Sequence, residues 1–382
     1  MSVYLGRNKV DITKFENLDT ELNEQEELLD ELETQVNELS DKPKDMLQER
    51  VDKTNSCDYL FYEYNGEELD ISRLDTSNVA SMRNMFQYCE ELKSVDLSHL
   101  DTRNVKDMYG VFYHCDVLTD VNTSGWDTSA CENMQYMFTA CLAITSLDLT
   151  HFDISKVKTL FGTFQQCKNL TNLNVSNWDT SACETMRAMF YICQRLLSID
   201  LSSFNTSNVT EMCYMFKDMY KIPLIDISNF DTRKVKDTTY MFSECRELVQ
   251  ILGSIDMVSV VNAGSMFTNC YKLTDVTLKN IKTALQIGSG TTYGHLLTLD
   301  SLLNTIKELW NMTGSSSKTL TVGSANLEKL ANVYVKLIDI TDEMRAEDEY
   351  IDNKLPFVQC ESTDAGAMLI SEYATSKNWQ LA

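Results

Sequence analysis

The chain has 382 residues, 43% of them hydrophobic, so it is long enough to bury a sizeable core. Its 57 acidic residues against 33 basic ones give a formal net charge of -24, which disfavours binding to nucleic acid or to an anionic membrane surface. With only 3 Pro and 13 Gly, the composition excludes collagen-like and Pro-rich or Gly-rich linker architectures.

The start of the chain lacks an apolar stretch of signal-peptide length, and no later apolar run is long enough to span a bilayer. We therefore expect no membrane insertion and a protein that is synthesised and kept reduced in a cytoplasm. In that setting the 12 cysteines are expected to be free thiols.

Residues 1–14 carry a pattern typical of a small β-hairpin. Two short segments, Val-Tyr-Leu at residues 3–5 and Lys-Val-Asp-Ile at residues 9–12, flank a Gly-Arg-Asn turn at residues 6–8. A hairpin of this size is too small to be stable alone, so we expect it to dock on something larger.

Residues 15–40 carry a heptad pattern, which predicts a coiled coil. The same segment holds ten acidic and no basic side chains. Exposed, salt-screened repulsions of about a few tenths of a kcal/mol each are weaker than burial of the apolar seam, so we expect a parallel homotrimer. The alternative is a helix that lies on its own solenoid as a cap. The expected oligomerisation residues are Phe15, Leu18, Leu22, Leu29, Leu32, Val36 and Leu39.

After a segment interpreted as a linker, residues 41–58, an internal period of 26 residues governs residues 59–282. Within each unit the apolar spacing changes from three-and-four, typical of a helix, to alternation, typical of a short strand. We therefore predict an α/β solenoid of about eight units, each a helix and a strand, with the strands in a parallel ladder. The period is marked by Phe86, Phe112, Phe138, Phe164, Phe190, Phe216 and Phe242.

One unit, residues 92–115, reads Leu-x-x-Val-Asp-Leu-Ser-x-Leu-Asp-Thr-x-Asn-Val-x-x-Met-x-x-Val-Phe-x-x-Cys. This frame resembles the 26-residue leucine-rich repeat of BspA-like surface proteins. The resemblance implies a leucine-rich-repeat array and an interaction surface, often an adhesive one, but it does not imply a particular ligand.

Beyond residue 283 the period is lost. The pattern predicts a helix over residues 297–310, a strand over 318–323, and further helices over 326–337 and 365–377. We expect residues 283–382 to form an α/β cap that keeps the last strand of the solenoid from being an open edge.

Two segments carry a second resemblance. The opening Tyr-Leu-Gly-x-x-Lys-Val, residues 4–10, precedes an acidic coiled coil, as in virion proteins of phages of gut Firmicutes. Residues 297–303, Leu-Thr-Leu-Asp-Ser-Leu-Leu, are similar to the closing segment of leucine-rich-repeat proteins of the same phages. This resemblance implies a bacteriophage virion protein, a tail fibre or receptor-binding protein, joined to other virion proteins through its N-terminus and located on the tail or particle surface.

The sequence favours binding over catalysis. We find no Ser-His-Asp arrangement, phosphate loop or Cys-x-x-Cys pair, so we expect no enzyme, cofactor or metal site. The cysteines that follow each Phe are interpreted as interior packing, and the Asp-Thr corners as turn caps.

The outward side of the strand ladder is the candidate ligand surface, suited to a host glycan or protein. The alternative is a merely solvated sheet face. Three functions stay open: host attachment by a phage virion protein, a bacterial surface adhesin of the BspA-like family, and a baseplate or capsid decoration protein without receptor binding. The residues of the candidate surface are Asp96, Asn122, Asp148, Asn174, Asp200 and Asp226.

Overall fold

The computed structural model describes residues 2–5, 8–11, 45–283, 285–286, 297–309, 318–321, 330–331, 333–337, 347–349, 354, 357–360, 367–376 and 379–381. Strands β1 (Ser2–Leu5) and β2 (Asn8–Asp11) pair antiparallel, with Ser2 opposite Asp11, so the predicted hairpin is confirmed. The coiled coil predicted over residues 15–40 lies outside the described residues.

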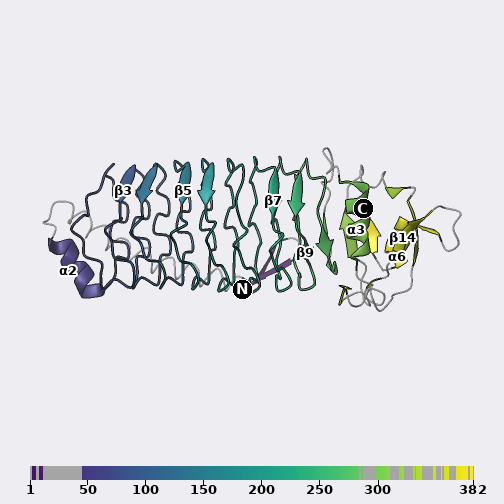
Figure 1. Cartoon of the computed structure of the whole chain (residues 1–382), viewed down its shortest axis with the longest axis horizontal. Helices are drawn as coiled ribbons and strands as arrows, with labels where there is room; N and C mark the ends of the chain where they lie inside the picture. The colour runs from purple at the N-terminus through teal and green to yellow at the C-terminus, as the bar shows by residue number, and fades with distance from the viewer. Residues whose placement is uncertain are drawn as a thin grey trace.

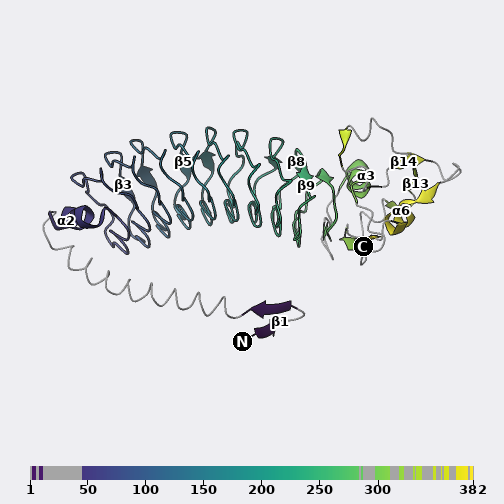
Figure 2. The ribbon, with the colours of Figure 1, turned by 90° about the horizontal axis from the view of Figure 1, so that it is seen from below.

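Residues 55–283 wind into a stack of coils that follows a gentle arc (Figures 1 and 2). Short parallel strands occupy one side of the coils: β3 (Ser94–Asp96) pairs with β4 (Asp120–Asn122), β5 (Ser146–Asp148) with β6 (Asn172–Asn174), and β7 (Leu224–Asp226) with β8 (Gln250–Leu252). A second parallel ladder of single-residue bridges joins Ser56, Ser81, Asp107, Asn133, Thr159, Thr185, Glu211, Asp237 and Asn262. The predicted solenoid with parallel strand pairs is therefore confirmed.

The helix predicted in each unit is wrong. Residues 55–283 are all described, and none of them lies in an α-helix. The segment from Met82 to Cys89 is instead a series of tight turns, in which the Met85 N–H donates to the Met82 carbonyl at 3.3 Å. The alternate N–H groups donate to the next coil, as Asn84 does to the Tyr109 carbonyl at 2.7 Å. The solenoid thus extends its hydrogen bonding along its axis without helix or strand.

A positive φ in these turns explains the misleading spacing. Asn84 has φ +53° and Tyr88 has φ +60°, the left-handed conformation that the third residue of a type II turn requires. Turns repeated in this way bring an apolar side chain to the interior every three or four residues, as a helix does. A hydrophobic period alone cannot distinguish the two backbones.

The core of the stack is a column of phenylalanines beside a column of thiols. Consecutive rings from Phe61 to Phe267 are stacked, with centroids 5.2–5.9 Å apart. The Cys141 thiol donates to the Phe112 carbonyl at 3.1 Å, and the same contact recurs from coil to coil. Burial raises the pKa of Cys141, so the thiol stays protonated. All twelve cysteines are free, and the packing interpretation is confirmed.

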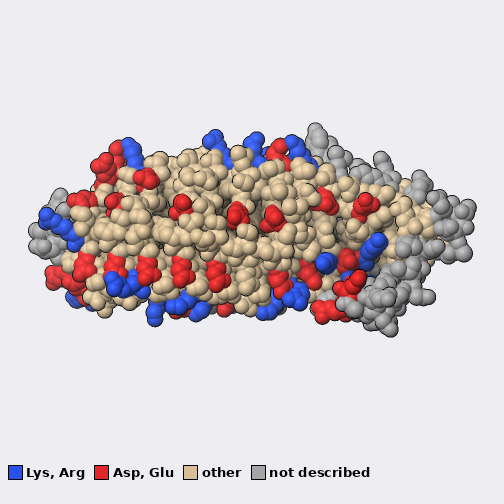
Figure 3. Space-filling model, in the orientation of Figure 1, with Lys and Arg blue, Asp and Glu red and all other residues tan. Residues whose placement is uncertain are grey.

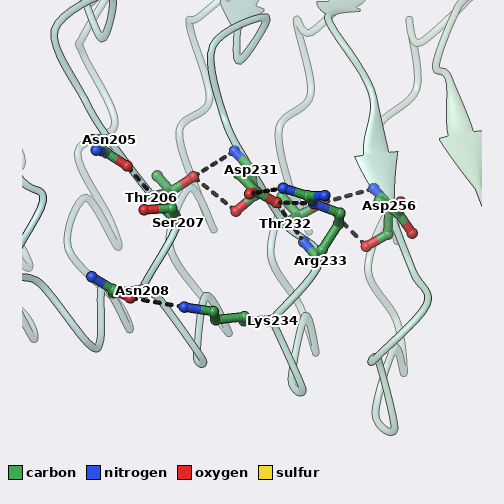
Figure 4. A network of polar contacts seen from close by, with 9 residues as sticks. All are labelled: Asn205, Thr206, Ser207, Asn208, Asp231, Thr232, Arg233, Lys234 and Asp256. Atoms are coloured by element: carbon green, nitrogen blue, oxygen red, sulfur yellow. Dashed lines mark hydrogen bonds and ion pairs between the residues drawn. The ribbon is translucent and has the colours of Figure 1, made fainter.

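The corners of the coils are held by side chains that bond to the backbone (Figure 4). The Asp231 carboxylate accepts the N–H of Arg233 at 3.0 Å, as expected for a turn cap. One coil earlier, the Thr206 hydroxyl accepts the Asp231 N–H at 2.8 Å and donates to the Asp231 carbonyl at 3.0 Å. Thr232 makes the same two bonds to Asp256. These buried hydroxyls therefore join each coil to the next.

Helix α2 (Asp45–Thr54) covers the first coils, within the segment expected to be a linker. Val51 is buried, and the Gln48 carboxamide accepts the Asp75 N–H at 2.7 Å and donates to the Asp75 carbonyl at 3.0 Å. At the other end lie strands β9 (Ile255–Asp256) and β10 (Leu278–Lys279), followed by helix α3 (Leu299–Lys307). The Ser301 hydroxyl donates to the Val276 carbonyl at 3.1 Å, so α3 is bonded to the last coil.

The remaining C-terminal elements form two three-stranded sheets and a helix. Strand β12 (Lys318–Thr321) lies between β11 (Leu285–Gln286) and β16 (Trp379–Leu381). Strand β13 (Tyr334–Leu337) lies between β14 (Phe357–Cys360) and β15 (Met368–Leu369), which is followed by α6 (Ile370–Ser376). The helix predicted over 326–337 is therefore wrong at residues 334–337. In the described part of the chain, no helix combines the length and apolar character needed to cross a membrane.

Candidate ligand-binding surface

The six predicted surface residues lie in one row, in which Asp96, Asn122, Asp148, Asn174 and Asp226 are the last residues of β3 to β7 and Asp200 holds the same position in a coil without a strand. Asp96 is exposed, and its carboxylate accepts the Ser98 N–H at 3.0 Å. This backbone hydrogen bond lowers the pKa of Asp96. Asp226 accepts the Ser228 N–H at 2.9 Å in the same way. One oxygen of each such side chain is thus occupied by its own turn, and the role of the row in ligand binding stays a prediction.

The strand ladder is interrupted between β4 and β5, which pair only with β3 and β6 respectively. A hollow of about 350 Å³ lies there, lined by residues 119–124 and by Ile144 with residues 146–151. It brings two predicted residues, Asn122 and Asp148, to one site. The His151 ring lies with Nε2 2.9 Å from the Thr123 carbonyl oxygen and bridges the two coils.

Aromatic rings inside the coils account for this interruption. Trp126 stacks on Phe152 with centroids 6.1 Å apart, directly behind the break between β4 and β5. This separation exceeds both the distance of about 4.8 Å between strands in a sheet and the 5.6 and 5.9 Å of the stacked Phe rings in the coils of the paired strands. The ladder is interrupted again between β6 and β7. In that part of the solenoid Trp178 stacks on Phe204 with centroids 6.5 Å apart, and Phe204 stacks on Phe230 with centroids 6.4 Å apart.

A second surface, made by the tight turns, was not predicted. Half-buried rings touch edge to face or tilted from coil to coil: Tyr88 and Tyr113 at 5.7 Å, Tyr109 and Tyr136 at 5.6 Å, and Tyr136 and Phe161 at 4.7 Å between centroids. Cations lie on several of these rings. We call this surface the aromatic face, comprising Tyr59, Tyr88, Tyr109, Tyr113, Tyr136, Phe161, Tyr191, Tyr214 and Tyr240.

One part of the aromatic face is hollowed, with a volume of about 350 Å³, and we call it the tyrosine groove. Its polar lining is Arg83, Asn84, Gln87 and Gln165. Asn84 is 4% exposed, and its Oδ1 atom has no hydrogen-bond partner, nor does the buried Oε1 atom of Gln87. Unpaired buried acceptors of this kind are costly and uncommon in native proteins. The rings of the groove are Tyr59, Tyr88, Tyr109, Tyr113 and Tyr136.

The charge of the groove is balanced within the protein. The Arg83 guanidinium lies 3.9 Å from the centroid of the Tyr109 ring and 3.7 Å from the Asp107 carboxylate. Burial raises the pKa of Tyr109, and it raises the pKa of Tyr136 to about 12. The phenols of Tyr109 and Tyr136 therefore remain neutral hydrogen-bonding groups at physiological pH.

Two glycines shape the groove. Fourteen non-glycine residues between Asn84 and Asn269 adopt a positive φ, so the left-handed turn position does not by itself demand glycine. A Cβ atom at Gly110 would lie 2.2 Å from Asn84 Oδ1, and one at Gly162 would lie 2.6 Å from the Tyr136 ring. At Gly110 and Gly162 a side chain of the groove packs directly against the backbone, which leaves no room for a Cβ atom.

The aromatic residues of the aromatic face recur at fixed positions of the repeat unit, which is visible in the sequence. Tyr109 and Phe161 hold the position after the first interior residue of the turn segment, and Tyr113 and Tyr191 the position after the repeated Phe. These two positions are four residues apart, so they would also share one face of a helix. Once the segment is known to be stacked turns, the same positions form columns along the solenoid.

The family described as "Mycoplasma protein of unknown function, DUF285" matches residues 55–173 and again residues 158–280. The chain belongs to the DUF285 family. The two matches cover the coils that form the strand row, the tyrosine groove and the rest of the aromatic face. The BspA-type repeat expected from the sequence is thus supported at the level of the family, while a phage origin is not part of this match.

Two solved structures are similar to this DUF285 chain. One is a leucine-rich repeat protein from Bacteroides ovatus ATCC 8483, with 17% identity, a TM-score of 0.33, and coverage of 64% of this chain and 72% of that one. The other is a leucine-rich repeat protein of Leptospira interrogans, with 11% identity, a TM-score of 0.24, and coverage of 71% and 72%. No curated protein matches the chain.

Proposed function

We propose that this protein recognises a cell surface through the tyrosine groove and is carried on a bacteriophage particle. The observation behind the binding role is the groove itself, in which packed tyrosines lie beside two carboxamides whose oxygen atoms have no hydrogen-bond partner among the described residues. Tyr and Arg are the residues that most often dominate binding energy at interfaces. Rings already fixed by their neighbours lose little conformational entropy when a ligand arrives.

The chemistry of the lining favours binding over catalysis. The groove presents phenols, carboxamides and one guanidinium, with neither a carboxylate nor an imidazole among its lining residues. Burial raises the pKa of Tyr136 to about 12, far from the range in which a phenol exchanges protons efficiently at neutral pH. We therefore propose a protein without enzymatic activity or cofactor, whose ligand is a glycan or protein on the host surface.

Carriage on a particle is proposed from the N-terminal segment. The hairpin of β1 and β2 is too small to be an independent domain, and the heptad seam that follows suits a homotrimer. In this proposal the hairpin binds other virion proteins and the seam presents three solenoids together. Three linked grooves bind a surface with higher avidity than one groove, because the second and third contacts become intramolecular.

The binding role is tested by adsorption of the purified full-length protein to a panel of gut Firmicutes. Tyr113→Leu should abolish adsorption, whereas Tyr191→Leu, at the equivalent position of a coil outside the groove, should leave it unchanged. Equal adsorption of both variants would show that the groove does not recognise the cell. Light scattering on the same preparation tests the trimer.

Particle carriage is tested by mass spectrometry and immunogold labelling of purified phage particles. A bacterial surface adhesin is the second candidate, favoured because the family is described from Mycoplasma, a cellular organism. Detection on cells and absence from particles would support the adhesin. Presence in particles together with no adsorption by the purified chain would support a decoration protein.

A further inference from the structure

We propose that the tyrosine groove binds an uncharged saccharide. This inference rests on the recognition function proposed above and specifies the class of ligand. It is carried by three properties of the groove: its charge, its unpaired polar atoms and the geometry of its rings.

The charge of the lining disfavours ionic ligands. Among the described residues that line the groove, Arg83 is the only one with a charged side chain, and its guanidinium is stacked on Tyr109 and lies 3.7 Å from the Asp107 carboxylate. An anionic ligand would find no uncommitted cation, and the acidic hollow beside Tyr88, which includes Glu63 and Glu90, would repel it. A cationic ligand would find no carboxylate among the lining residues. A neutral ligand fits this balance.

The unpaired polar atoms favour a ligand that carries hydroxyl groups. Asn84 and Gln87 each bring a carboxamide to the groove, and the oxygen of each is buried without a hydrogen-bond partner. A hydroxyl group can donate to such an oxygen and accept from the amide nitrogen beside it. A purely apolar ligand would leave both oxygens unpaired and would gain no hydrogen bond from them.

The rings provide the apolar contacts that a sugar needs. The Tyr88 and Tyr113 rings are nearly perpendicular, at 84°, as are those of Tyr109 and Tyr136, so ring faces and ring edges alternate along the groove. The face of an aromatic ring carries negative charge density, which attracts the C–H bonds on the flat side of a pyranose. The volume of about 350 Å³ lies at the small end of the range for ligand pockets and suits one or two sugar rings.

The test is a glycan array that carries neutral, sialylated and uronic-acid-containing glycans, probed with the full-length protein. The best neutral glycan is then measured by isothermal titration calorimetry. Tyr113→Leu and Gln87→Leu should each weaken its affinity at least tenfold, and Tyr191→Leu should leave it unchanged. Gly110→Ala should also weaken it, because the new Cβ atom displaces the Asn84 carboxamide. Melting temperatures confirm that each variant is folded.

Two results would overturn the inference: binding to charged glycans alone, or no neutral glycan bound above the level of the Tyr113→Leu variant. The cell adsorption experiment separates this failure from that of the recognition function. If adsorption depends on Tyr113 but no neutral glycan binds, the ligand is of another class and the recognition function stands. If adsorption does not depend on Tyr113, both proposals fall.

Discussion

The hydroxyl group of Thr180 forms two hydrogen bonds to one residue of the next coil, accepting the Asn205 N–H at 2.8 Å and donating to the Asn205 carbonyl at 2.9 Å. The Thr180 side chain is fully buried, so its hydroxyl forms these bonds within the protein rather than with solvent. The pair recurs in Thr206 and Thr232 and is interrupted at Ile154, which holds the equivalent position. A polar column of this kind fixes the register between coils.

Thr180→Val should therefore lower the free energy of unfolding by about 1–3 kcal/mol, because it preserves the shape of the side chain but removes both of its hydrogen bonds to the Asn205 backbone. The midpoint of urea denaturation measures this effect. Thr171→Val is the matched control, since the Thr171 hydroxyl also bonds to a neighbouring coil but is exposed. A loss of the same size in both variants would refute the role of the buried column.

Ile192 adopts φ +66°, a conformation that is unfavourable for a β-branched residue. Ile192→Asn should raise the free energy of unfolding by roughly 1 kcal/mol, because Asn tolerates the left-handed region. Ile192→Val keeps the β-branch and should not share this gain. An unchanged or lower denaturation midpoint for the Asn variant would mean that packing of the half-buried Ile192 side chain outweighs the strain.

Because the corner aspartates have lowered pKa values, we expect the protein to lose stability in acid. Hydrogen bonds from the second residue after each corner lower the pKa values of Asp75, Asp101, Asp127 and Asp153. A carboxylate whose pKa is lower when folded contributes stability above its unfolded pKa of about 4, and this contribution is lost as the pH falls through the folded pKa. Melting temperature should therefore drop below about pH 4.

The fourfold Asp→Asn variant at these corners is the test of that pH dependence. Asn205 already accepts the Ser207 N–H at 3.1 Å, so an amide can form the same turn. The variant should fold and lose less stability between pH 5 and pH 2.5 than the unmodified protein. An identical acid profile would assign the transition to other groups.

Thiol accessibility tests the interior column of cysteines. Cys360 is partly exposed, and the other eleven cysteines are buried. Burial raises the pKa of Cys167 to about 12, and it also raises the pKa of Cys193. The reactive thiolate form of these cysteines is therefore scarce at pH 8. A thiol reagent should rapidly modify one cysteine in the native protein. In denaturant it should modify all twelve cysteines. Rapid modification of several thiols in native protein would contradict the packing described above.

The 26-residue period already determines that the chain stacks, because no single unit can bury its own apolar side. The repeated Phe and Cys positions also identify the core, since columns of identical side chains must face one another in a register set by the period. The corner aspartates are recognisable as caps from residue type alone. These features are local or follow from repetition.

The backbone of the turn segment and the location of the groove depend on tertiary contacts. A spacing of three and four residues fits a helix and a series of type II turns equally well, and bonds such as the one from Asn84 to Tyr109 decide between them. Those bonds join residues 25 positions apart, so no local propensity encodes them. The tyrosines of the groove hold different positions of their units, so the period alone does not bring them together, and only the folded coils show that they meet around one groove. The break between β4 and β5, beside the stacked rings of Trp126 and Phe152, is likewise a feature of the tertiary structure.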